Sequence, residues 1–125
     1  MALRRFVVPV TVDESGEAEV YSPVLSGKLI SVRYVKPDSG GYTNGVDFDI
    51  TSEAIGQDLW AEDNVNASAT RYPRAQLQTT AGADSLYAAD GTSVNGKIAL
   101  SQDRIKIVIA NAVSGIGTFH FTLDN

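Results

Sequence analysis

Few side chains in this sequence are of types that carry out chemistry. The chain contains one histidine, His120, and no cysteine. Histidine is the side chain whose ordinary pKa lies near neutrality, so His120 is the one candidate general base. It alternates with Phe119 and Phe121 in a strand-like run, which predicts that it faces away from the core with Thr118 and Thr122. No serine motif such as G-x-S-x-G accompanies it, so we expect a surface or interface residue.

Asp47 and Asp49 are the second candidate site. Because side chains alternate along a strand, the two carboxylates share one face about 6–7 Å apart. That spacing suits a divalent cation or a glycosidase-type pair of carboxylates. Neither flank supplies a recognisable set of further oxygen ligands, and a solvated strand face is the favoured interpretation. The acidic segment Asp13–Glu17 offers a weak cation site in the same way, with a charged tight turn favoured.

Aromatic and arginine side chains gather in the less regular middle of the chain. Trp60, Tyr72 and Tyr87 are of types that stack on sugars or anchor protein interfaces, and they equally close the ends of a sandwich. Arg71 and Arg74 flank a Tyr-Pro pair, which is a typical interface composition. No phosphate-binding loop or dinucleotide fingerprint is present. We therefore expect no enzyme activity, no cofactor and no metal.

Composition limits the class of protein. The 125 residues suit one domain over residues 1–125, and 43% hydrophobic with 20% charged residues is ordinary globular composition. The lack of cysteine excludes a disulfide framework and a thiolate metal site, and fits a reducing cytosol. The net charge of −5 disfavours a dedicated nucleic-acid binder. No apolar run approaches the ~20 residues that span a membrane, and Pro9 interrupts the only signal-like stretch, Phe6–Val12.

Strands and turns account for almost the whole pattern. The alternation predicts strands over Phe6–Val12, Lys28–Lys36, Val46–Thr51, Gln57–Ala61, Ala67–Tyr72, Lys97–Leu100, Arg104–Ala110 and Thr118–Leu123. Pro9 places the first strand at a sheet edge or a bulge. We interpret Thr80–Asp90 as a loop with one helical turn around Asp84–Ala88. The expected fold is all-β: a single antiparallel β-sandwich, jelly-roll-like, of about eight short strands.

The predicted connections and core follow from the same alternation. The turn Asp13–Gly16 predicts a hairpin that brings Ala18 and Val20 back beside the first strand. The glycine-containing linker Asn111–Gly117 suits a second hairpin loop. The expected core residues are Val8, Val10, Ile30, Val32, Phe48, Ile50, Ile105, Ile107, Phe119 and Phe121.

Several short sequence segments, spread over nearly the whole chain, resemble those of one known family. They are Leu3–Val12, Gly45–Ala54, Ala67–Arg74, Gln102–Ala110, Ser114-Gly115 and Gly117–His120. Together they resemble small proteins encoded in tailed phages and prophages, and the chain is similar to capsid cement, or decoration, proteins. The resemblance implies a structural virion protein on the outer surface of an icosahedral head, made in the host bacterial cytoplasm. Its partners would be the major capsid protein, whose subunits it bridges, and copies of itself as a dimer or trimer on the shell.

The resemblance carries over no functional residues of the family, so the contact residues are expected from the predicted fold and from residue type. Chain ends and irregular segments are expected to do so, because the strands are used in the sandwich: Met1–Arg5, the Pro37–Gly45 loop and the 62–92 region. The expected interface residues are Leu3, Arg4, Arg5, Arg71, Tyr72, Arg74 and Tyr87. The guanidinium groups of Arg4 and Arg5 suit acidic patches on a capsid, although a frayed terminus is the alternative for that end.

Two other functions remain open on the sequence. The first is a tail- or head–tail-associated binding module, including a carbohydrate-binding one that uses Trp60 and the loop tyrosines. The second, ranked last, is a small hydrolase that uses Asp47 and Asp49. Neither nucleic acid nor a membrane is expected as a partner.

Overall fold

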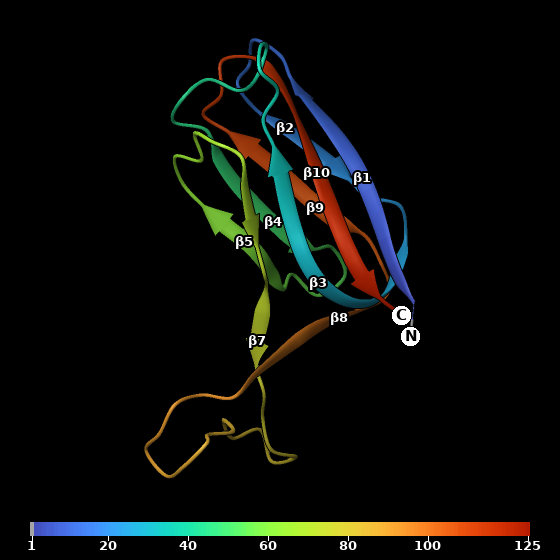
Figure 1. Cartoon of the computed structure of the whole chain (residues 1–125), viewed down its shortest axis with the longest axis vertical. Coiled ribbons are helices and arrows are strands. Elements are labelled where there is room, and N and C mark those ends of the chain that lie inside the picture. The colour runs from blue at the N-terminus through green and yellow to red at the C-terminus, as the bar shows by residue number, and fades with distance from the viewer. Residues whose placement is uncertain (1) are drawn as a thin grey trace.

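The computed structural model describes residues 2–125, which form two antiparallel sheets packed face to face (Figure 1). The six-stranded sheet has the order β1-β10-β3-β8-β7, with β6 also paired to β3, and the four-stranded sheet has the order β2-β9-β4-β5. The strands are β1 (Leu3–Val12), β2 (Ala18–Tyr21), β3 (Leu25–Val35), β4 (Asp47–Ser52), β5 (Asp58–Glu62), β6 (Ala69–Arg71), β7 (Arg74–Gln76), β8 (Asn95–Asp103), β9 (Ile105–Ala110) and β10 (Gly115–Asp124). No helix long and apolar enough to cross a membrane occurs among the described residues.

The strand order is that of a jelly roll. Without the short strands β6 and β7, the two sheets are β1-β10-β3-β8 and β2-β9-β4-β5. The chain changes sheet after β1, β2, β3, β5, β8 and β9, which is the double-sheet arrangement of two Greek keys. The predicted all-β, jelly-roll-like sandwich is therefore confirmed. β1 lies at a sheet edge, as Pro9 predicts, because proline has no N–H to donate to a second neighbouring strand.

Two predicted hairpins are in fact crossovers between the sheets. The turn Asp13–Gly16 does not bring β2 back to β1, because β1 pairs with β10 and β2 pairs with β9. The linker Asn111–Gly117 likewise joins strands of different sheets. Apolar alternation is the same whether two strands pair or face each other across a core, so it does not separate the two cases. The crossovers touch where the Ala112 N–H donates to the Gly16 carbonyl at 3.1 Å.

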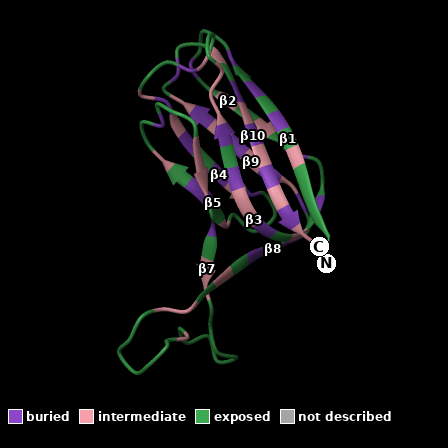
Figure 2. Cartoon of the chain, in the orientation of Figure 1, coloured by how far each residue is buried: buried purple, intermediate pink, exposed green. Residues whose placement is uncertain are grey.

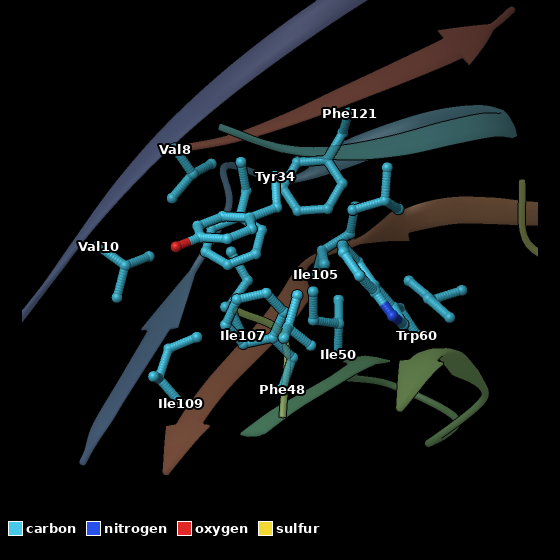
Figure 3. Packing of buried hydrophobic residues seen from close by; sticks show 14 of the residues in the cluster. Val8, Val10, Tyr34, Phe48, Ile50, Trp60, Ile105, Ile107, Ile109 and Phe121 are labelled. Atoms are coloured by element: carbon cyan, nitrogen blue, oxygen red, sulfur yellow. The ribbon is translucent and has the colours of Figure 1, made fainter. Parts of the chain in front are cut away.

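The inward faces of the two sheets share one core, whose centre is aromatic (Figure 3). The Phe48 ring lies 4.8 Å from the Tyr34 ring and 5.1 Å from the Phe119 ring, edge to face in both cases. Such pairs add about 0.5–1.5 kcal/mol beyond the area that they bury. The Tyr42 hydroxyl donates to the buried carbonyl oxygen of Val10 at 2.6 Å. The core therefore joins both sheets and holds the loop that carries Tyr42.

Ile30 is the one expected core residue that is not buried. Ser31 pairs with Thr122 and Leu29 pairs with Leu123, so the register shift leaves Ile30 in a bulge of β3. An extra residue in a strand moves the following side chains to the opposite face. Leu29 is therefore fully buried, whereas Ile30 is only partly buried. The other predicted core residues are all buried.

Residues 77–94, here called the arm, extend from β7 and β8 away from the sandwich (Figure 1). Figure 2 shows that the arm is exposed along most of its length. The helical turn predicted around Asp84–Ala88 is wrong. Leu77 donates its backbone N–H to Val94, Val94 to Ser85 and Ser85 to Leu77, at 2.8, 3.0 and 2.8 Å. Because both backbone groups of Ser85 are used across the arm, they are not available for helical hydrogen bonds.

Candidate functional site

The outer face of the six-stranded sheet, here called the basic face, carries most of its charge as cations. Its basic side chains include Arg5, Lys28, Arg33, Arg74, Lys97 and His120. Asp124 lies beside Lys97, with 3.8 Å between carboxylate oxygen and ammonium nitrogen. This face is positive although the whole chain has a net charge of −5. The acidic residues must therefore be concentrated elsewhere.

A hollow of about 370 Å³ lies on the basic face between β1, β10, β3 and the end of β6. It is lined by Arg5, Ser31, Arg33, Thr70, Tyr72, His120 and Thr122. The sheet register places Arg33 directly opposite His120, and Arg5 directly opposite Thr122. We call this site the basic hollow. Three segments far apart in the sequence supply its positive groups, with hydroxyl groups between them.

The surroundings of His120 lower the pKa of its imidazole from the ordinary value of 6.5. Partial burial is the larger cause, and the positive charges of Arg5 and Arg33 add to it. Both effects disfavour the imidazolium form. The strand alternation predicts the outward position of His120 correctly, and the structure places it, half-buried, on the outer face of β10.

The outer face of the four-stranded sheet, here called the acidic face, has the opposite character. Its carboxylates include Glu19 of β2, Asp47 and Asp49 of β4, and Asp63 after β5. A depression of about 410 Å³ lies beside Asp47, Asp49 and Asp63. Glu19 forms an ion pair with Lys106 at 2.9 Å. Within residues 2–125, no group of three or more His, Cys, Asp or Glu side chains is arranged to hold a metal ion.

Asp47 and Asp49 share a face, as the alternation predicts, but Asp47 is already bonded within the chain. One carboxylate oxygen of Asp47 accepts the backbone N–H of Asn64 at 3.0 Å. The other accepts the side-chain amide of Asn111 at 2.5 Å. Asp47 thus connects two loops to β4, so its carboxylate has a structural role on this face and is not merely solvated.

The predicted interface residues Arg71 and Arg74 are both bonded within the chain. Arg71 forms a two-pronged ion pair with Glu62, with both distances 2.9 Å, and its guanidinium lies 5.3 Å from the centre of the Trp60 ring. The ion pair lowers the pKa of Glu62 and raises that of Arg71. Arg74 donates to the carbonyl oxygen of Ile30 at 3.1 Å. Both arginines therefore hold segments of the sandwich in place.

The described part of the N-terminus is a strand rather than a loose end. Leu3 pairs with Asp124 and Arg4 pairs with Leu123 in the β1–β10 ladder. The Ala2 N–H also donates to the Asn125 carbonyl at 3.0 Å. Met1, which belongs to the predicted contact segment Met1–Arg5, lies outside the described residues. Leu3, Arg4 and Arg5 are all exposed, so they remain available to a partner from an ordered position.

The Pro37–Gly45 loop, also expected to make contacts, packs partly against the start of β10. The Ile116 N–H donates to the Gly40 carbonyl at 2.9 Å, and the Val113 N–H donates to the Thr43 hydroxyl at 2.9 Å. Tyr42, within the loop, is buried. The loop therefore closes one end of the sandwich, and only its outer residues are exposed.

The tyrosines and the tryptophan of the middle region lie in different environments. Tyr72 and Tyr87 are 64% and 76% exposed, while Trp60 is 5% exposed and belongs to the core. Trp60 is therefore not available to stack on a sugar. Leu77 and Leu86 of the arm are 46% and 41% exposed, and the sequence analysis missed both. Apolar side chains inside a polar, alanine- and glycine-rich loop are the signal that points to them.

Comparisons with known proteins give no family. No protein-family model matches the chain, and no curated protein sequence matches it. Among solved structures, it is similar to FlhE, with a TM-score of 0.48, 8% identity and full coverage of both chains. It is also similar to dimeric latent PorU from Porphyromonas gingivalis, with a TM-score of 0.43 and 8% identity over 13% of that chain.

Proposed function

We propose that this chain is a structural virion protein that binds the outer surface of a phage head as a cement protein. The observation that carries the proposal is the arm. Leu77, Leu86 and Tyr87 are 46%, 41% and 76% exposed on a segment that backbone hydrogen bonds hold in shape. Exposed apolar side chains gathered on one projecting element are typical of a contact surface. The sequence resemblance to decoration proteins supplies the class of partner, the major capsid protein.

The two differently charged faces support the same proposal. A domain with a basic face and an acidic face docks on a charged surface in a preferred orientation, because like charges repel. Cement binding needs only modest affinity for each contact, since many copies and neighbouring contacts multiply weak bonds. Bridging of adjacent subunits would use the arm on one subunit and the sandwich on the next, alone or as a dimer or trimer.

The proposal is tested by sedimentation of purified protein with phage heads that lack it. The variant Leu86→Ser/Tyr87→Ser removes apolar area from the arm, whereas Ile55→Ser removes a side chain that is 73% exposed on the sandwich. We expect saturable binding in a fixed ratio to the capsid subunit. The arm variant should bind at least about tenfold more weakly, as expected for loss of interface anchors, and Ile55→Ser should match the wild type.

The same sedimentation experiment can also contradict the cement proposal. Wild-type protein that fails to sediment with heads at micromolar concentration contradicts it. Equal binding by wild type and the arm variant would show that the arm is not the contact. A thermal unfolding curve for each variant ensures that lost binding does not reflect lost folding.

A tail- or head–tail-associated binding module is the second candidate. It is favoured by Tyr72 and Tyr87, which are exposed aromatic side chains of the kind that stack on sugars. Sedimentation with purified tails in place of heads separates it from the cement proposal. For its carbohydrate-binding form, a glycan array should show binding that Tyr72→Ala or Tyr87→Ala abolishes.

A further inference from the structure

We propose that the basic hollow is a docking site for an acidic segment of a partner protein, whose side-chain carboxylates bind Arg5, Arg33 and His120. The site lies on β1, β10 and β3, apart from the arm (Figure 1). It therefore stands or falls independently of the cement proposal. It goes beyond that proposal because it assigns a ligand chemistry to a defined set of residues.

The geometry brings three basic groups to one side of the sheet. His120 lies directly opposite Arg33 on β3, and Thr122, two residues along the same face, lies opposite Arg5 on β1. Neighbouring strands are about 4.8 Å apart. The two guanidinium groups thus stand on either side of β10, with the imidazole between them. This spacing suits a carboxylate or a pair of carboxylates lying across β10.

Arg5 and Arg33 differ from Arg71 and Arg104 in their lack of partners. Arg71 pairs with Glu62 and Arg104 pairs with Glu53. In residues 2–125, neither Arg5 nor Arg33 makes a hydrogen bond or an ion pair. Guanidinium groups form paired, charge-assisted hydrogen bonds with carboxylates. The hollow therefore presents two guanidinium groups that have no internal hydrogen-bond partner.

Hydroxyl groups complete the lining of the hollow. Ser31, Thr70, Tyr72 and Thr122 surround the basic groups, and hydroxyls donate hydrogen bonds to carboxylate oxygens. Among residues 2–125, no carboxylate lines the hollow. The nearest on the same strand, Asp124, pairs with Lys97. An incoming carboxylate thus meets donors and cations only.

Charge favours an acidic protein segment over a nucleic acid. The chain carries −5 overall and has an acidic face on its other sheet, so a long polyanion that wraps the domain would be repelled. A short acidic segment can contact the basic face alone. Its carboxylates match the planar fork of arginine.

Binding should be coupled to protonation of His120. Burial lowers its pKa, and the positive charges of Arg5 on β1 and Arg33 on β3 lower it further. A bound carboxylate places a negative charge beside the ring and raises that pKa. Binding therefore favours the protonated ring, and affinity for the acidic segment should increase as pH falls through the pKa of His120 in the bound form.

The experiment uses the full chain and a hexaglutamate peptide with blocked ends. Binding is measured by fluorescence anisotropy for wild type, Arg5→Gln, Arg33→Gln and the matched control Arg4→Gln. Arg4 is one residue along β1, opposite Leu123, and so lies on the other side of the strand. We expect Arg5→Gln and Arg33→Gln each to weaken binding at least about tenfold, and Arg4→Gln less than about twofold. Arg33→Lys, which keeps the charge without the fork, should fall between them.

Other outcomes overturn the proposal. Equal losses for all three Gln variants would show non-specific attraction rather than a site. A hexaglutamine peptide or inorganic phosphate that binds as tightly as hexaglutamate would exclude carboxylate recognition. Sedimentation equilibrium that shows self-association reversed by Asp49→Asn would assign the basic face to a second copy of the chain. Thermal unfolding of each variant must match the wild type.

Discussion

The two outer faces of the sandwich differ in whether their charged side chains have partners within the chain. On the acidic face, Asp47 bonds two loops and Glu19 pairs with Lys106. On the basic face, Arg5 and Arg33 flank His120 without an internal partner among the described residues. Charges that are paired within a chain serve its own structure. Charges held together without a counter-charge cost free energy, and this cost is offset when a partner supplies the opposite sign.

The comparison also separates the two kinds of arginine in the predicted interface. Arg71 and Arg74 bind Glu62 and a backbone carbonyl, whereas Arg5 is exposed on β1 and lines the basic hollow. The Arg-Tyr-Pro-Arg segment, Arg71–Arg74, is therefore weaker support for an interface than the unpaired Arg5 of β1. The sequence does not distinguish the two kinds of arginine, because it shows the residue type and not the internal partner.

Replacement of Phe48 should have the largest effect, because both faces rest on the same core. Phe48 contacts Tyr34 and Phe119 of the opposite sheet. We expect Phe48→Ala to lower the free energy of unfolding by about 3–5 kcal/mol, measured by urea denaturation. Trp60 fluorescence, which reports the four-stranded sheet, should give the same midpoint as circular dichroism. A loss below about 1 kcal/mol, typical of surface sites, would contradict the assigned core.

Asp47 and Asp49 provide the next test, within the acidic face. Asp47→Ala removes two hydrogen bonds to loops, and we expect a loss of about 1–2 kcal/mol of unfolding free energy. Asp49→Ala, two residues along β4 on the same face, should change the free energy of unfolding by less than about 0.5 kcal/mol. Equal effects would show that the charge of the acidic face, rather than the loop contacts, determines stability.

The sequence predicts faces well and neighbours poorly. The alternation around Phe119, His120 and Phe121 correctly places the histidine outside and the rings inside. Alternation repeats every two residues whichever strand lies alongside, so it does not predict that Arg33 lies opposite His120. The bulge at Ile30 breaks the pattern without a marker such as glycine or proline. The basic hollow thus depends on strand order, which follows from the whole jelly roll.

The ion pair between Glu62 and Arg71 should have a smaller, pH-dependent effect. Its side chains are 37% and 42% exposed, so solvent screening limits its contribution to under about 1 kcal/mol. The pKa of Glu62 is lowered in the folded state. Its stabilisation is therefore present above the unfolded pKa and is lost as pH falls through the folded one. Between pH 6 and 3, Glu62→Gln should lose less unfolding free energy than wild type, as measured by urea titration.

His120→Ala should have the smallest effect on stability. The side chain lies on the outer face and is half-buried, so we expect a change below about 0.5 kcal/mol near pH 7.5. Because the folded-state pKa of His120 is lowered, wild type should lose slightly more stability than the variant as pH falls below the unfolded value. Thermal unfolding at pH 7.5 and 5.5 measures this difference. A large loss at pH 7.5 would show that the ring is part of the core.

The account depends most on the claim that the positive charges of the basic hollow are not neutralised by carboxylates of the described residues. NMR titration of the His120 ring protons tests it most directly, in wild type and in Arg5→Gln, Arg33→Gln and Arg4→Gln. We expect a wild-type pKa below the ordinary 6.5, raised by Arg5→Gln and by Arg33→Gln and unchanged by Arg4→Gln. A wild-type pKa at or above 6.5, or one that neither hollow variant raises, would contradict the account.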